Sequence, residues 1–199
     1  YILITHLPLM LPARILFIIL FMSSSEHLAV IKFDKFKNLK EIYNLQRLKT
    51  GELFRFSCIS PCILAGKANK IKIFEEFSSN LGLAFQIKDD LLDYSLDEKV
   101  IGKPVFQDLK EGKITYPFYF SYRNANKKQK NQLQTMLGKK KQNIKSAYNM
   151  IKDLNGFAET EILASKYFDK AIKHANLIKN KHINQEVLKL VNSALYREK

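Results

Sequence analysis

The chain has 199 residues, enough for one well-buried domain. Its 46% hydrophobic residues, with only 7 glycines and 5 prolines, exclude a disordered or collagen-like chain. A formal charge of +14 favours polyanionic partners such as nucleic acid, anionic lipid or diphosphate esters. Cys58 and Cys62 lie four residues apart, which excludes a disulfide framework and predicts a reducing compartment, the cytoplasm.

Residues 1–22 are the most apolar part of the chain, so two interpretations compete for them. A membrane anchor needs about 20 uninterrupted apolar residues. Two prolines, a histidine and an arginine leave only Ile15 to Met22 as an unbroken apolar run. We therefore expect a buried or remnant helix and no stable membrane insertion, with an anchor as the alternative.

The remaining sequence predicts one helix after another, because apolar residues recur at spacings of three and four. The segment from Ser95 to Lys113 is the exception, and its glycines and proline predict a long functional loop. The expected fold is all-α. The predicted helices cover residues 34–48, 49–65, 69–94, 114–124, 126–137, 140–153, 158–178 and 183–197.

Three carboxylates lie within two turns of one predicted helix, in the segment GLAFQIKDDLLDY. They are Asp89, Asp90 and Asp93, and the first and last share a face. Like charges at this spacing weaken a helix unless cations neutralise them. Mg²⁺ prefers such oxygen ligands and completes its shell with water and phosphate oxygens. The alternative is a solvated acidic turn that Lys88 neutralises.

Lysines flank this acidic segment on both sides. Lys103 and Lys113 lie in the loop that follows, and Lys49 and Thr50 open an earlier predicted helix. Metal-bound carboxylates that face ammonium groups can hold a diphosphate, because both neutralise its charge. Each lysine alone would otherwise be an ordinary surface charge.

Three segments together carry a family resemblance: KTGELFRFSC, GLAFQIKDDLLDY and GKPVFQDLKEGKITYP. Residues from about 38 to 199 resemble the carboxyl-terminal half of a trans-isoprenyl diphosphate synthase of the farnesyl or geranyl type. Residues 1–37 are apolar and degenerate by comparison. The resemblance implies a helical bundle of the isoprenoid synthase type, incomplete at its amino-terminal side, and a homodimer.

The resemblance also implies an activity and a role for each site residue. The activity would be the Mg²⁺-dependent condensation of an allylic diphosphate with isopentenyl diphosphate. Thr50 and Gln86 would lie beside the reacting carbons, where their oxygens favour developing positive charge. Asp89, Asp90 and Asp93 would bind Mg²⁺. The diphosphate would be contacted by Lys49, Lys103, Lys113 and Arg197, and the catalytic set would be Lys49, Thr50, Gln86 and Lys103.

The sequence departs from the family pattern at its amino-terminal side, where the Gly-Lys and Arg elements that would hold isopentenyl diphosphate and a Gly-Gly-Gln-like segment are missing. The family uses two aspartate-rich motifs, whereas the acidic residues among residues 1–66 are isolated. We therefore expect negligible prenyl transfer by this chain alone. Three origins fit: a truncated or frameshifted product, part of a longer enzyme, or a noncatalytic subunit that pairs with a full-length synthase. A nucleic-acid partner is not expected, because it gives the acidic cluster no role.

Overall fold

The computed structural model describes residues 39–94, 105–139 and 143–196, and these residues form helices without any β-strand. The predicted all-α fold is confirmed. The expectations for residues 1–37 concern a segment outside the described residues. No helix in the described ranges is long and apolar enough to cross a membrane. The main helices are α3 (Leu39–Gln46), α4 (Glu52–Leu64), α5 (Ile71–Asp93), α7 (Gln107–Lys110), α8 (Tyr116–Asn124), α9 (Lys127–Met136), α10 (Ile144–Asp153), α11 (Gly156–Ala175) and α12 (Lys181–Leu195).

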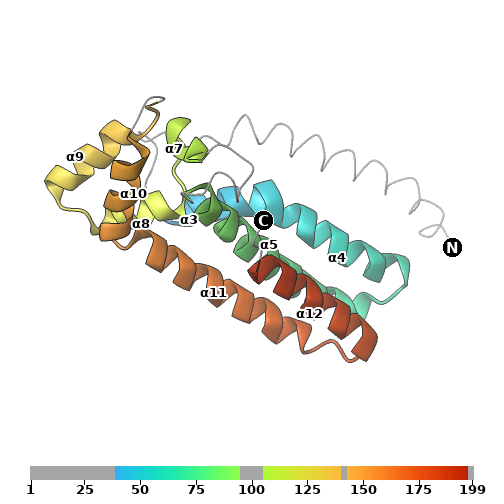
Figure 1. Ribbon diagram of the computed structural model, residues 1–199. Helices are drawn as coiled ribbons and strands as arrows, with labels where there is room; N and C mark the ends of the chain where they lie inside the picture. The colour runs from blue at the N-terminus through green and yellow to red at the C-terminus, as the bar shows by residue number, and fades with distance from the viewer. Residues whose placement is uncertain (1–38, 95–104, 140–142, 197–199) are drawn as a thin grey trace, which may run out of the picture.

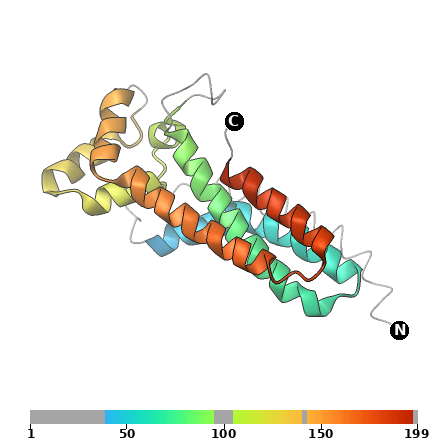
Figure 2. The ribbon, with the colours of Figure 1, turned by 60° about the horizontal axis from the view of Figure 1, so that its bottom comes forward.

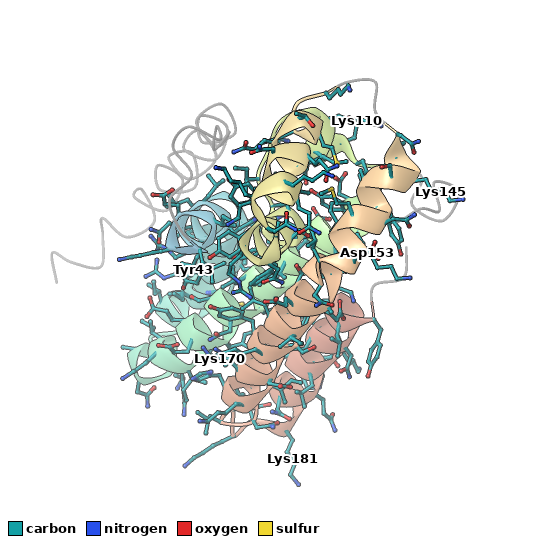
Figure 3. All side chains as sticks on the ribbon, turned by 90° about the vertical axis from the view of Figure 1, so that its left-hand side faces the viewer. Tyr43, Lys110, Lys145, Asp153, Lys170 and Lys181 are labelled. Atoms are coloured by element: carbon teal, nitrogen blue, oxygen red, sulfur yellow. The ribbon has the colours of Figure 1, made fainter. Side chains whose placement is uncertain are left out.

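Helix α5 is the central element of the bundle. It packs most extensively against α11 and α4, while α12 lies beside α11 (Figure 1). Turning the view keeps α4, α5, α11 and α12 side by side, with α9 and α10 at one end (Figure 2). Lys110 of α7 and Lys181 of α12 mark opposite ends of the molecule (Figure 3).

The core position of α5 follows from its apolar pattern. Phe77, Leu81, Ala84 and Ile87 recur at spacings of three and four, and none is more than 3% exposed. Burying a large apolar side chain contributes about 1.5–3 kcal/mol each. The same face continues to Asp90 near the end of the helix, which places a carboxyl group in the interior.

A glycine in α5 lets the chain before α4 approach closely. A Cβ atom on Gly82 would lie 3.1 Å from the Cα atom of Gly51 and 3.1 Å from the Cβ atom of Phe54. The segment Arg47–Gly51, which is one turn of π-helix between α3 and α4, therefore lies directly against α5. This close approach brings Thr50 within hydrogen-bonding distance of α5.

The prediction of a wholly non-helical segment from Ser95 to Lys113 was wrong in one part. Residues Gln107–Lys110 form the short helix α7, which follows Phe106 in a left-handed conformation with φ of 59°. The N–H groups of Gln107 and Asp108 donate to the Asp93 side chain. This distant carboxyl group satisfies the free donors at the start of α7, a contact that local sequence does not reveal.

The two cysteines lie on α4, as predicted, and neither forms a disulfide. Cys62 is 8% exposed and belongs to the buried set, while Cys58 packs against the core from a partly buried position. Burial raises the pKa of the Cys58 thiol to about 11. Both cysteines therefore contribute to apolar packing, and Cys58 remains a neutral thiol at neutral pH.

Candidate diphosphate and metal site

Polar side chains from four parts of the sequence meet at the carboxyl-terminal end of α5. The π-helical turn supplies Thr50, α3 supplies Gln46, and the start of α8 supplies the Tyr116 backbone. The short helix α7 reaches the same end of α5 through Asp93 (Figure 1). Segments separated by tens of residues therefore form one polar cluster.

Asp90 lies at the centre of this cluster and is only 3% exposed. Its Oδ2 atom accepts hydrogen bonds from Gln46 Nε2 at 2.9 Å and from the Tyr116 backbone N–H at 3.4 Å. Its Oδ1 atom accepts from Gln86 Nε2 at 3.3 Å. Gln86 in turn accepts a hydrogen bond on Oε1 from the Thr50 hydroxyl at 2.6 Å. The sequence predictions for Thr50, Gln86 and Asp90 thus fall on one continuous chain of contacts.

Burial is the main influence on the Asp90 carboxyl group. Loss of water, and then the nearby Asp108 carboxylate, raise its pKa from 3.8 to about 8. Hydrogen bonds from Gln86, Tyr116 and Gln46 act in the opposite direction because they stabilise the charged form. Asp90 is therefore a buried carboxyl group that is stabilised by hydrogen bonds from Gln46, Gln86 and the Tyr116 backbone.

Asp93 lies one turn further along and is turned toward α7. The backbone N–H of Gln107 donates to its Oδ1 atom at 3.0 Å, and that of Asp108 donates to Oδ2 at 3.1 Å. Burial and the Asp108 charge raise the pKa of Asp93 to about 6, while Lys113 acts in the opposite direction. The carboxyl groups of Asp90, Asp93 and Asp108 are thus concentrated at this end of α5.

Two lysines near the cluster are already engaged. Lys113 Nζ lies 2.7 Å from Glu111 Oε2 and 3.4 Å from Asp108 Oδ1. Lys88 does not neutralise an acidic turn, because its ammonium group pairs with Glu161 of α11 at 2.9 Å. The alternative of a solvated acidic turn required Lys88 as the neutralising cation. Lys88 is paired with Glu161 of α11 instead.

Three predicted site residues fall where no side chain is described. Lys103 and Arg197 lie outside the described residues, so their predicted roles stay predictions. Lys49 belongs to the π-helical turn, and only its backbone is described. Asp89 lies on α5 beside Asp90 and is partly exposed.

Two residues that belong to this cluster were not predicted. Gln46 contacts Asp90 from 44 positions away, and Asp108 affects both Asp90 and Asp93. Gln46 carries no signal of its own in the sequence, because a glutamine near the end of an amphipathic helix is usually a surface residue. Asp108 lies within the third motif quoted above, so its charge could have been counted with the acidic cluster.

The donor set suits a hard divalent cation. Among the described residues, no three His, Cys, Asp or Glu side chains converge as a complete metal cage. Mg²⁺ does not need one, because it is commonly held by one or two carboxylates, with water and phosphate oxygens completing its shell. Asp89 and Asp93 share a helical face, and burial and then the Asp108 carboxylate raise the pKa values of Asp90 and Asp93, so a nearby cation would favour their ionised forms.

A hollow of about 370 Å³ adjoins this cluster. Its walls come from α3, α8 and α11, and they include Tyr43, Tyr116 and Tyr167. Figure 3 shows Tyr43 on α3. Tyr116 joins the two features, because it lines the hollow and its backbone N–H donates to Asp90. An apolar, aromatic space therefore lies beside a site with concentrated acidic charge.

Comparison with known proteins agrees with this arrangement. The model of the polyprenyl synthetase family matches residues 22–154. A probable mitochondrial hexaprenyl pyrophosphate synthase from Yarrowia lipolytica is 32% identical over 156 residues, which are 76% of this chain and 33% of that protein. A geranylgeranyl diphosphate synthase from Sulfolobus acidocaldarius is 34% identical over 158 residues, covering 76% of this chain and 47% of that protein. The two names imply different product lengths, so the comparisons do not distinguish a farnesyl or geranyl type.

A solved structure shows the same fold. Geranylgeranyl pyrophosphate synthetase from Pyrococcus horikoshii superimposes with a TM-score of 0.79 and 28% identity, over 94% of this chain and 59% of that one. The chain spans between one third and one half of the length of the two curated relatives. The family match, the relatives and the fold lead to one conclusion: the chain belongs to the polyprenyl synthetase family.

Proposed function

We propose that this chain provides the allylic-diphosphate half of a prenyl transfer site. The reaction would join an allylic diphosphate to isopentenyl diphosphate, with loss of the allylic diphosphate group. The observation that carries the proposal is the gathering of Thr50, Gln86, Asp93 and Lys113 at one end of α5. These groups come from separate segments, and they combine carboxylates, a cation and neutral oxygen acceptors beside an aromatic hollow.

Asp89 and Asp93 are the residues we assign to Mg²⁺. They lie on one helical face, and two carboxylates are sufficient when phosphate oxygens complete the shell. When bound, the ion would neutralise charge on the diphosphate as it leaves. Asp90, which the sequence groups with these two residues, is 3% exposed and accepts three hydrogen bonds from protein donors, whereas Asp93 is partly exposed and accepts two, which leaves lone pairs for a metal ion. Its role is argued separately below.

The basic residues would hold the remaining charge of the diphosphate. Lys113 lies close enough to Asp93 to influence its charge. An anion bridged to Asp93 through Mg²⁺ would therefore compete with Glu111 and Asp108 for the Lys113 ammonium group. Lys49, Lys103 and Arg197 are proposed for the same purpose from the family resemblance. Thr50 and Gln86 would place oxygen atoms beside the carbon that becomes positive.

Complete turnover needs more than these groups. The sequence contains one aspartate-rich cluster, and removing members of a catalytic set that acts as a unit can abolish most of the rate. We therefore propose that residues 1–199 bind a diphosphate with Mg²⁺ but do not condense it alone. A homodimer or a pairing with a full-length synthase, and a cytoplasmic location, complete the proposal.

The test is calorimetric titration of a bisphosphonate with a small neutral side chain, with and without Mg²⁺. The parent chain is expected to bind at least about tenfold more tightly with Mg²⁺ present, since that factor corresponds to about 1.4 kcal/mol. Asp89→Asn is expected to remove most of this gain. Asp153→Asn, on an exposed face of α10 (Figure 3), is the matched control and is expected to keep it.

Two results would contradict the proposal. One is binding that does not respond to Mg²⁺ in the parent chain. The other is an equal loss in Asp89→Asn and Asp153→Asn, which would indicate a general effect of surface charge. Product formation from both diphosphates by the purified chain would contradict only the expectation that it is inactive alone.

A further inference from the structure

We infer that Asp90, held by Gln46 and by the Tyr116 backbone, fixes the orientation of the Gln86 amide so that oxygen atoms face the reacting carbon. Asp90 is thereby a positioning residue, and the metal is left to Asp89 and Asp93. This inference rests on the proposed function. It assigns a role to Gln46, which no motif in the sequence marks.

Hydrogen-bond donors surround Asp90 on both of its oxygens. Three N–H groups meet its two oxygens: Gln46 Nε2 and the Tyr116 backbone at Oδ2, and Gln86 Nε2 at Oδ1. In its ionised form, this carboxylate, which is 3% exposed, accepts at both oxygens and is satisfied by protein donors. Asp89, by contrast, is partly exposed on the same helix.

The hydrogen bonds that link Asp90, Gln86 and Thr50 run in one direction. Because Gln86 Nε2 donates to Asp90, its Oε1 atom must face the other way, toward Thr50. The Thr50 hydroxyl therefore donates its only proton to Gln86, at 2.6 Å. The lone pairs of Thr50 remain available as acceptors, and a positive carbon beside them would be stabilised.

The hydrogen bond from the Tyr116 backbone to Asp90 cannot reverse its direction. The Tyr116 donor at Oδ2 is a backbone N–H group, which has no alternative orientation. In an Asp90→Asn variant, the oxygen must therefore stay at the Oδ2 position, where Gln46 also donates. The new NH₂ group then faces Gln86 Nε2, and Gln86 must turn its oxygen toward Asn at position 90. Its NH₂ group would face Thr50, whose proton would be redirected away from Gln86.

The experiment compares two bisphosphonates of similar size, one with a protonated amine in its side chain and one with a neutral side chain. The bisphosphonate group reports Mg²⁺ binding, while the amine reports the oxygen acceptors of Thr50 and Gln86. Asp90→Asn is expected to keep the Mg²⁺ dependence of the neutral compound within about twofold. It is expected to lower the preference for the cationic compound about tenfold, the effect of one hydrogen bond to a charged group. Asp89→Asn is expected to do the reverse.

A compensating variant separates orientation from loss of charge. In Asp90→Asn/Gln86→Glu, the new carboxylate accepts both from Asn at position 90 and from Thr50, and the net charge of the parent is retained. The double variant is expected to restore the preference to within about twofold of the parent value. A loss of Mg²⁺ dependence in Asp90→Asn overturns the inference, because it would make Asp90 a metal ligand. Failure of the double variant to recover the preference overturns it as well.

The outcomes also separate this inference from the function on which it rests. A parent chain that binds neither bisphosphonate contradicts the proposed function, and the positioning role falls with it. A parent that binds both compounds with Mg²⁺, but whose preference is unchanged in Asp90→Asn, contradicts the positioning role alone. Gln46→Met keeps the Asp90 carboxyl group and removes one donor, so we expect a smaller loss of preference, about threefold, with unchanged Mg²⁺ dependence.

Discussion

The acidic motif contains three side chains with different surroundings, although they are adjacent in sequence. Asp90 is enclosed by side-chain and backbone donors, Asp93 accepts two backbone N–H groups of α7, and Asp89 lies partly exposed beside them. Helical geometry explains the separation, since residues one apart point about 100° away from each other. The spacing of the three aspartates therefore does not imply that they have the same role.

The buried Asp90 should give stability a distinctive pH dependence. Its pKa is about 8 in the folded chain, above the value near 3.9 of an unfolded aspartate. The folded state thus holds the proton more tightly, so the stabilisation is present below about pH 4 and is lost as pH rises toward 8. We expect the unfolding free energy of the parent, minus that of Asp90→Asn, to fall from pH 4 to pH 8. Urea denaturation in this range measures it, and a difference that rises with pH would contradict the assignment.

Lys110, at the end of α7, and Lys113, just after it, should differ in their effect on diphosphate binding. Lys113 lies near Asp93, whereas Lys110 donates to the Val105 carbonyl group. We expect Lys113→Gln to weaken Mg²⁺-dependent bisphosphonate binding about tenfold, as for one charge-assisted hydrogen bond. Lys110→Gln is the matched control, and a change within about twofold is expected. Calorimetry of both variants checks this. Equal losses of affinity would indicate that Lys113 acts only as a general surface charge.

Among the elements, the contact between α5 and the π-helical turn is the one on which the site depends. The absence of a side chain at Gly82 allows this contact. Gly82→Ala would force α5 and the turn apart, and we expect it to reduce the unfolding free energy by about 1–3 kcal/mol, as overpacking usually does. The contact between Thr50 and Gln86 should weaken in parallel.

Gly51→Ala provides the matched comparison on the other side of the same contact. A Cβ atom there would meet Arg47 Cγ at an ordinary 3.6 Å, and the backbone is already right-handed helical with φ of −60°. We expect an unchanged stability or a gain of up to about 1 kcal/mol from helix propensity. Denaturation curves of the two variants decide the matter, and similar losses in both would mean that the close approach is not specific to Gly82.

The helices themselves could be predicted well because their signals are local. Apolar spacing located α4, α5, α8 and α11, and asparagines that accept backbone N–H groups begin three others: Asn126, Asn143 and Asn180. The short helix α7 could not be predicted this way. Its first N–H groups are satisfied by Asp93, and that contact exists only after the loop has folded back on α5.

At the scale of the whole molecule, the sequence predicted the all-α class and the family but only part of the site. Thr50, Gln86 and Asp90 were identified through motifs, and the structure brings them into contact. Gln46 was not identified, because its importance arises from a tertiary contact over 44 positions. A motif gives the residue types along the chain. It does not give the hydrogen-bond directions around Asp90, because these depend on the Tyr116 backbone N–H group that faces it in the folded chain.

The bundle places its polar cluster at one end of the central helix, with an aromatic hollow beside it. Long helices α4, α11 and α12 support α5 along its length (Figure 2). Under the proposed function, the polar cluster would hold the diphosphate head and the adjoining hollow would face the apolar tail of the substrate. This division follows from the sequence of α5, whose apolar face ends at Asp90.

The central claim is that Asp89 and Asp93 hold a metal ion that bridges directly to a diphosphate. The most direct measurement is electron paramagnetic resonance of Mn²⁺, used in place of Mg²⁺, on the full chain with ¹⁷O-enriched pyrophosphate. Direct bonding between the metal and phosphate oxygen predicts broader Mn²⁺ lines than with unenriched pyrophosphate, and no such protein-bound signal in Asp89→Asn/Asp93→Asn. The same broadened signal in that double variant, or bound Mn²⁺ without broadening in the parent chain, would contradict the account.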